Sequence, residues 1–149
     1  MQLTRFTDLG LRVLMYLTQR DPMVPVTIPG IAERFGISRN HLVKVVHAMG
    51  QQGWLVTTRG KGGGIALARP AAEYRIGEVI RSLEATGSLI DCATPPCLLM
   101  PGCRLKSALD EGLEAFYRSL NGYTLADLVA ERTGEAIIRL HRGRPADAP

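Results

Sequence analysis

Apolar side chains recur at three- and four-residue intervals over residues 4–19, which predicts an amphipathic helix. Its apolar stripe consists of Phe6, Leu9, Val13, Tyr16 and Leu17. Asp21 and Pro22 follow, and a proline at this point ends the helical pattern. The chain therefore opens with one helix that needs a partner for its apolar face.

Two more helices are predicted at 28–35 and 38–52, separated by Gly36. Thr27 precedes the first helix and Ser38 begins the second, and hydroxyl side chains are favoured as N-caps. The second helix has a complete stripe to bury, made of Leu42, Val45, Val46 and Met49. Two short strands, 54–58 and 65–67, then flank a glycine-rich tip, which is typical of a hairpin. This order predicts a helix-turn-helix followed by a wing.

The second half of the chain returns to helical spacing after Pro70. We expect a connecting helix within 71–87, an irregular loop over 88–103, a long helix over 104–120 and a short helix starting at Thr124. The predicted fold is mainly α: a winged helix-turn-helix with a small β-hairpin wing and a long C-terminal dimerisation helix. The predicted divisions are a DNA-binding domain (1–70), a connecting helix (71–87), a cysteine loop (88–103), the dimerisation and C-terminal helices (104–141) and a flexible tail (142–149).

The distribution of charged residues also changes at about residue 70. The whole chain has a net charge of +4, yet residues 1–70 contain 9 basic and 3 acidic residues, while 71–149 contain 9 basic and 11 acidic. A basic half of this kind favours a polyanionic partner, most commonly nucleic acid. No apolar run is long enough to span a membrane and no secretion signal opens the chain, so a cytoplasmic protein is expected.

Double-stranded DNA is the partner that the predicted winged helix favours. Opposite the buried stripe of helix 38–52 and at its start lie side chains able to contact bases and phosphates. At the wing tip, glycine lets the backbone approach DNA closely and cations neutralise phosphates. Either feature alone is also typical of an ordinary solvated surface, and only their combination favours DNA. The candidate residues are Ser38, Arg39, Asn40, His41, Lys44, His47, Arg59, Lys61 and Gly62.

All three cysteines, Cys92, Cys97 and Cys103, lie within 12 residues of one loop. This spacing lacks the close pairs typical of zinc sites, whereas soft thiolates at wider intervals suit an iron-sulfur cluster. Such a cluster usually takes four cysteines, so one ligand is missing. It could be exogenous, or come from elsewhere in the chain or from a partner subunit.

The opening residues 1–17, the wing sequence from Thr58 to Gly64 and the three-cysteine loop together resemble the NsrR/IscR family of winged-helix regulators. The resemblance covers the chain up to about residue 129. In the IscR branch a histidine three residues after the last cysteine is the fourth ligand, but Lys106 stands there, and a protonated ammonium cannot bind a metal. In the NsrR branch an aspartate of the first helix serves instead, and Asp8 stands at that position.

The resemblance implies a repressor that senses nitric oxide through a [4Fe-4S] cluster held by Cys92, Cys97, Cys103 and Asp8 of the partner subunit. Loss or nitrosylation of the cluster would release the operator. We expect a homodimer formed through the 104–120 helix on a palindromic operator. For Asp8 the competing interpretation is a surface carboxylate that pairs with Arg12 four residues on.

Other functions stay open at this stage. One is a related regulator that senses cluster assembly, or redox state through a [2Fe-2S] cluster. Another is a regulator that binds a small molecule in its apo form. A zinc or thiol enzyme is disfavoured, because no histidine lies near the cysteines and no catalytic triad or metalloprotease helix is present. We therefore expect the protein not to be an enzyme.

Overall fold

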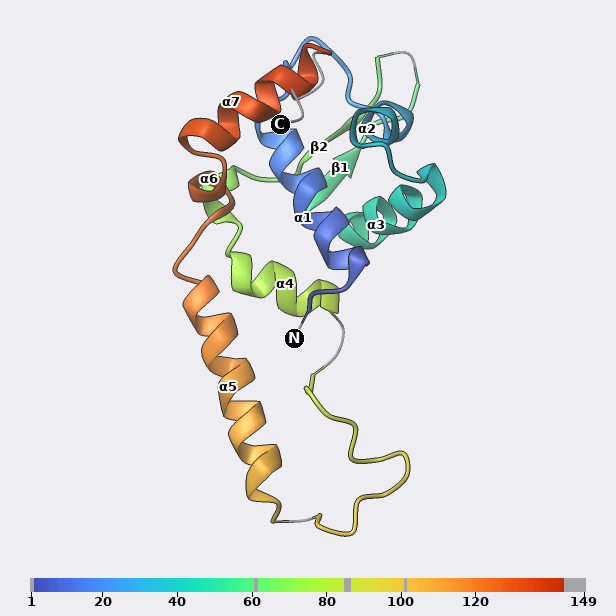
Figure 1. Ribbon diagram of the computed structural model, residues 1–149. Helices are drawn as coiled ribbons and strands as arrows, with labels where there is room; N and C mark the ends of the chain where they lie inside the picture. The colour runs from blue at the N-terminus through green and yellow to red at the C-terminus, as the bar shows by residue number, and fades with distance from the viewer. Residues whose placement is uncertain (1, 61, 85–86, 101, 144–149) are drawn as a thin grey trace.

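The computed structural model describes residues 2–60, 62–84, 87–100 and 102–143, and this part of the chain is mainly helical with one antiparallel hairpin (Figure 1). The predicted fold class is confirmed. The elements are α1 (Arg5–Thr18), α2 (Ile28–Phe35), α3 (Arg39–Gln51), β1 (Leu55–Thr57), β2 (Ile65–Leu67), the 3-10 turn η1 (Ala71–Glu73), α4 (Ile76–Glu84), α5 (Arg104–Leu120), α6 (Leu125–Leu128) and α7 (Glu131–His141).

The helix-turn-helix forms as its local signals predict, with one exception. The Thr27 hydroxyl accepts a hydrogen bond from the Gly30 N–H (3.2 Å), which caps α2. Gly36 ends α2 in the left-handed conformation (φ 61°), where glycine carries no steric cost. Ser38 is the N-cap residue of α3, as predicted, but its side chain makes no capping hydrogen bond to the described residues. The turn is set by Gly36 and by burial of the α3 stripe.

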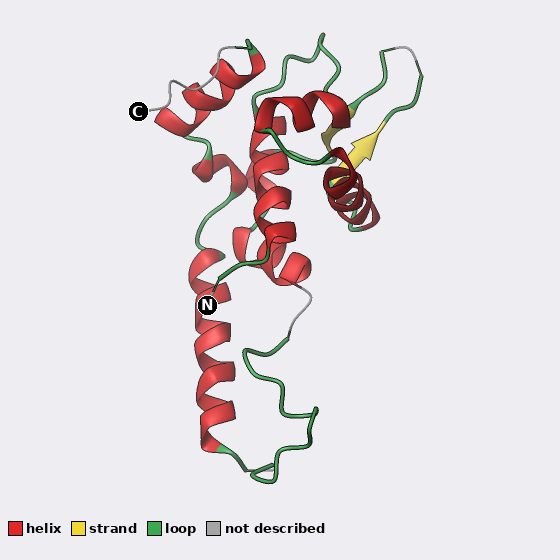
Figure 2. Ribbon diagram, turned by 45° about the vertical axis from the view of Figure 1, so that its right-hand side comes forward, coloured by secondary structure: helices red, strands yellow, loops and turns green. Residues whose placement is uncertain are grey.

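The wing is a hairpin whose base is attached to the segment before α2. Its strands pair Leu55 with Leu67 and Thr57 with Ile65. The Ile65 N–H donates to the Val26 carbonyl (2.8 Å), so the hairpin is hydrogen-bonded to the helix-turn-helix as well as to itself. Figure 2 shows the hairpin beside α3, with its tip extending away from the helices.

Helices α4 and α5 approach closely at Gly77. A Cβ atom there would collide with the Tyr117 carbonyl and the Asn121 side chain. Nearby, the Arg81 guanidinium donates two hydrogen bonds of 2.7 Å to the Glu114 carboxylate, and these hydrogen bonds hold the pKa of Glu114 below its ordinary value. These contacts involve the C-terminal half of α5, so the apolar residues near its N-terminus, such as Leu105, lie outside them.

The C-terminal region consists of two short helices. Thr124 and Asp127 form a reciprocal capping box at α6, and the hydrogen bonds from Thr124 lower the pKa of Asp127. The spacing of apolar residues does not predict the bounds of the second of these helices, α7. This helix packs against α1 through His141. The His141 ring stacks on Tyr16 with centroids 3.8 Å apart, and its Nε2–H donates to the Tyr16 carbonyl (2.8 Å).

One cluster of buried side chains extends from α1 through the helix-turn-helix and the base of the wing to α4, α6 and α7, and includes Leu113 and Tyr117 of α5. Figures 1 and 2 both show α5 and the cysteine loop leaving this body together, as an extension away from α2 and the wing. The division of the chain into functional segments stays a prediction. Of the predicted flexible tail, residues 144–149 lie outside the described part.

Candidate DNA-binding surface and sensor loop

Helix α3 presents a polar face because its apolar stripe is buried. Leu42, Val45, Val46 and Met49 are at most 4% exposed. The opposite positions point to solvent, and all six predicted contact residues of this helix and its N-cap are exposed: Ser38, Arg39, Asn40, His41, Lys44 and His47. The arrangement can donate hydrogen bonds and cationic charge to a polyanion along a surface about three turns long.

The wing tip is shaped by its glycines. The Thr58 N–H donates to the Gly64 carbonyl (2.9 Å) and the Gly63 N–H donates to the Gly60 carbonyl (2.9 Å). A Cβ atom at Gly63 would collide with the Thr58 carbonyl, so only glycine fits there. Gly62 has a φ of 82° and is exposed, as is Arg59. Lys61, the second predicted wing cation, lies outside the described residues.

Sequence reasoning assigned no role to Val43, an exposed apolar residue of α3. Val43 is neither in the buried stripe nor among the predicted contacts, yet it is 44% exposed. It borders a groove of about 470 Å³ between α2, α3 and β1. Its spacing of three residues from Asn40 and four from His47 places it on the polar face, and this spacing is the signal that could have identified it.

The three predicted cysteine ligands are free thiols, half-buried on the loop before α5. The Cys97 N–H donates to the Cys92 carbonyl (3.0 Å), which closes a turn between these two. Cys103 is the N-cap residue of α5, with its carbonyl accepting from the Ser107 N–H (3.3 Å). Within the described residues, no group of three or more His, Cys, Asp or Glu side chains gathers closely enough to hold a metal ion. One chain alone therefore does not bring the predicted ligands together.

Asp8 lies on the first turns of α1, where its carboxylate accepts a hydrogen bond from Arg12 Nε (2.9 Å). Both side chains are about half exposed. Asp8 also borders a surface depression of about 360 Å³ with Arg5, Leu11 and the segment before α1, and no described residue of the cysteine loop lines it. The pairing predicted as the competing interpretation is thus present, while the carboxylate remains accessible from outside the chain.

Lys106 is fixed by an ion pair that the sequence analysis did not consider. Its Nζ donates to Asp110 Oδ2 (2.6 Å), one turn further along α5. This hydrogen bond raises the pKa of Lys106 against the opposing effect of desolvation, and the nearby Cys92 and Cys103 add to the rise. The other Asp110 oxygen, Oδ1, is buried and has no hydrogen-bond partner among the residues that the structure describes. A carboxylate at i+4 from a lysine is the signal that could have predicted the pair.

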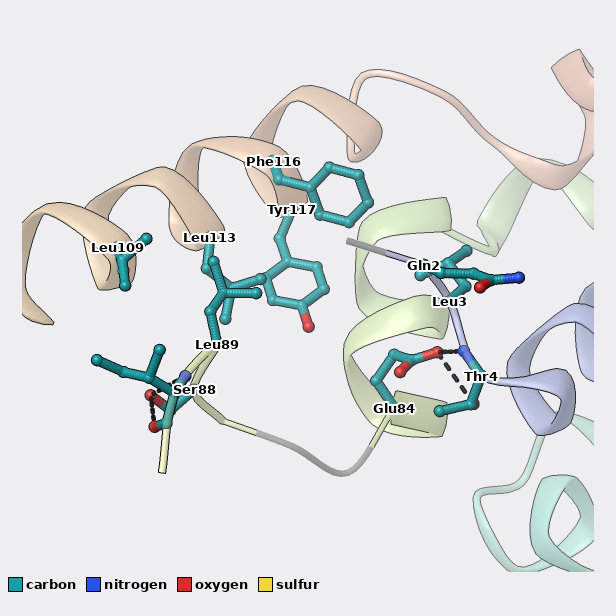
Figure 3. A pocket seen from close by; sticks show the side chains of 11 residues that line it. Gln2, Leu3, Thr4, Glu84, Ser88, Leu89, Leu109, Leu113, Phe116 and Tyr117 are labelled. Atoms are coloured by element: carbon teal, nitrogen blue, oxygen red, sulfur yellow. Dashed lines mark hydrogen bonds between the residues drawn. The ribbon is translucent and has the colours of Figure 1, made fainter. Parts of the chain in front are cut away.

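A cavity of about 530 Å³ lies where the loop, α4, α5 and the N-terminal segment meet (Figure 3). Leu113 and Phe116 line it from α5, and Leu89 lines it from the loop. At its edge, Glu84 Oε1 accepts hydrogen bonds from the Thr4 N–H (2.8 Å) and the Thr4 hydroxyl (3.1 Å). The end of α4, from which the loop departs, is therefore hydrogen-bonded to the cap of α1.

The chain was compared with known protein families and with solved structures. A family model described as Rrf2, iron-dependent transcriptional regulator, matches residues 3–131. Among solved structures, CymR, the global cysteine regulator of B. subtilis, is 22% identical over 87% of this chain and 97% of that chain (TM-score 0.70). IscR of T. potens is 26% identical over 87% and 86% (TM-score 0.69). CymR of Staphylococcus aureus is 23% identical over 86% and 98% (TM-score 0.67).

These likenesses agree with the winged-helix fold and with the position of the wing after α3. None of the described helices is long and apolar enough to cross a membrane. Because the family model spans most of the chain, the protein belongs to the Rrf2 family of transcriptional regulators.

Proposed function

We propose that this regulator is a DNA-binding repressor that responds to nitric oxide through an iron-sulfur cluster. The observation that carries the proposal is the confinement of every cysteine of the chain to one 12-residue stretch of the loop before α5, all as free thiols. Three soft donors on an irregular segment match the chemistry of iron-sulfur ligation. The ligands would be Cys92, Cys97, Cys103 and Asp8 of the partner subunit, and the cluster a [4Fe-4S] type, with [2Fe-2S] as the alternative.

The fourth ligand is proposed from a second chain because of where Asp8 lies. It borders a depression on α1 that no described loop residue lines, and its carboxylate is accessible. Lys106 cannot serve, since Asp110 holds its ammonium and raises its pKa. When bound, the cluster supplies iron atoms that nitric oxide can ligate. Asp8 binds through oxygen, a harder and more labile ligand than thiolate.

Dimerisation supplies the second chain. Rrf2 regulators bind DNA as dimers, and α5 offers a surface for this purpose: Leu105 at its start is 63% exposed, and Leu109 and Phe116 are half-buried. A ligand set shared between α1 of one subunit and the loop of the other would fix the distance between the two copies of α3. Once this tie is lost, the recognition helices no longer match two half-sites of a palindrome, and DNA affinity falls.

The experiment is anaerobic purification followed by visible absorbance and by iron and sulfide quantitation. We expect a brown dimer, whereas Cys97→Ser should be colourless and bind its operator weakly. Stoichiometric zinc in a colourless wild-type protein would contradict the proposal. A variant that stays brown after Cys97→Ser would remove that residue from the ligand set.

The test of Asp8 needs a control that separates cluster ligation from the ion pair with Arg12 within α1. Asp8→Ala and Arg12→Ala both break the ion pair, but only the first removes the carboxylate. We expect Asp8→Ala to change the absorbance spectrum and the rate of bleaching by nitric oxide, with Arg12→Ala resembling wild type. Equal behaviour of the two variants, with only a drop in thermal stability, would show that Asp8 serves α1 alone.

A second candidate is a cluster-sensing regulator of iron-sulfur assembly or of redox state. The 26% identity to IscR of T. potens favours it, while Lys106 at the position of that branch's histidine disfavours it. DNA binding that persists after nitric oxide treatment, yet depends on the cluster, would favour this candidate. An enzyme is not proposed, because the family consists of transcriptional regulators.

A further inference from the structure

Val43 is an exposed apolar residue in the middle of a polar helix face. Asn40 lies one turn before it and His47 one turn after it, and both are exposed, as is the adjacent Lys44. Val43 itself is 44% exposed. Valine is also a weaker helix former than most residues suited to an exposed helix position. Helix stability therefore does not explain a valine here, and packing covers only part of its side chain.

The surroundings of Val43 indicate what it meets. It is the fifth residue of α3, in the half of a recognition helix whose side chains reach base edges. The exposed cations Arg39 and Lys44 on the same helix attract a polyanion. The groove that Val43 borders has the buried Val46 and Leu55 on its wall and His47 at its rim, so apolar surface continues beneath the polar face.

We propose that Val43 recognises the C5-methyl group of a thymine in the major groove, and so acts as a specificity-determining residue. This inference rests on the proposed function, in which α3 is the recognition helix. Valine can neither donate nor accept a hydrogen bond, and the thymine methyl is the apolar group that the major groove displays. Its β-branched side chain has one strongly preferred rotamer in a helix, so little conformational entropy is lost when the contact forms.

The test removes the methyl from the DNA and the side chain from the protein in turn. A duplex library with a randomised core is enriched with the wild-type protein, and the enriched duplex is rebuilt with deoxyuridine in place of each thymidine. For one such thymine in a single half-site we expect the wild-type Kd to rise about fourfold, the worth of one buried methyl group. The same replacement should leave the Kd of Val43→Ala unchanged.

Val56→Ala is the matched control, since Val56 is an equally exposed valine (49%) on β1 rather than on α3. This variant should lose affinity about fourfold on methyl removal, as wild type does. Identical methyl effects in wild type and Val43→Ala, or no methyl effect at all on an enriched sequence, would overturn the assignment alone. Failure of the wild type to enrich any sequence would overturn the proposed function together with it.

Discussion

Tyr74 joins the wing to the body of the protein through its hydroxyl group. The hydroxyl donates to the Trp54 carbonyl (2.6 Å) and accepts from the N–H groups of Ala68 (3.1 Å) and Arg69 (3.3 Å). The side chain is fully buried. We expect Tyr74→Phe to lower the free energy of unfolding by about 1 kcal/mol, because it removes the hydrogen bonds of a buried hydroxyl while the Ala68 N–H still donates to the Trp54 carbonyl (3.0 Å). Urea denaturation measures this change.

Tyr123→Phe is the control for this prediction. Tyr123 is 53% exposed, so loss of its hydroxyl should change the free energy of unfolding by no more than about 0.5 kcal/mol. Equal effects of the two substitutions would mean that the Tyr74 hydrogen bonds contribute no net stability. A tyrosine in the sequence does not reveal such a role, because its partners come from segments up to 20 residues away.

Helix α5 carries an apolar face that its own chain covers only in part. Leu113 and Tyr117 are buried near α4, whereas Leu105 is 63% exposed. If a second copy packs on the exposed part, Leu105→Glu places an unpaired charge in the interface. We expect the dimer dissociation constant to rise about tenfold or more, as for an interface hot spot. Analytical ultracentrifugation of the apo protein measures it without interference from the cluster.

Met23→Glu is the matched control, because Met23 is 87% exposed in the turn between α1 and α2. It should leave the dissociation constant unchanged. A dimer that tolerates Leu105→Glu as well as this control would move the interface elsewhere. The bounds of α5 follow from local spacing and caps. Leu105 stays exposed because α4 packs on the other end of α5, near Glu114.

Charge is distributed unevenly over the whole molecule, with the basic excess in residues 1–70. We expect Arg59→Ala at the wing to weaken binding to all DNA sequences alike. It should also reduce the slope of log K against log salt by about one unit, because one phosphate contact is lost. Fluorescence anisotropy across a salt series measures both quantities.

Arg139→Ala removes the same charge from α7, outside the predicted DNA-binding segment, and is the control. Its salt slope should equal that of wild type. An unchanged salt slope in Arg59→Ala would mean that Arg59 contacts solvent and not a DNA phosphate. The comparison separates a local contact from the effect of net charge, since both variants lower the net charge by one.

Local signals in the sequence predict helices α1 to α6, the hairpin and the cysteine loop, because hydrophobic spacing, caps such as Thr27 and turns such as Gly36 act between near neighbours. The competing interpretation of Asp8, its pairing with Arg12, also follows from local spacing, since the pair spans one helical turn. Helical spacing places Val43 on the polar face of α3, but the packed fold sets how much of it stays exposed, and the fold alone brings Glu84 to Thr4 and stacks His141 on Tyr16. The Glu84 and His141 contacts join residues 80 and 125 positions apart, and the exposure of Val43 depends on which neighbouring elements cover α3. Such relations come from packing of the whole chain, which local periodicity does not encode.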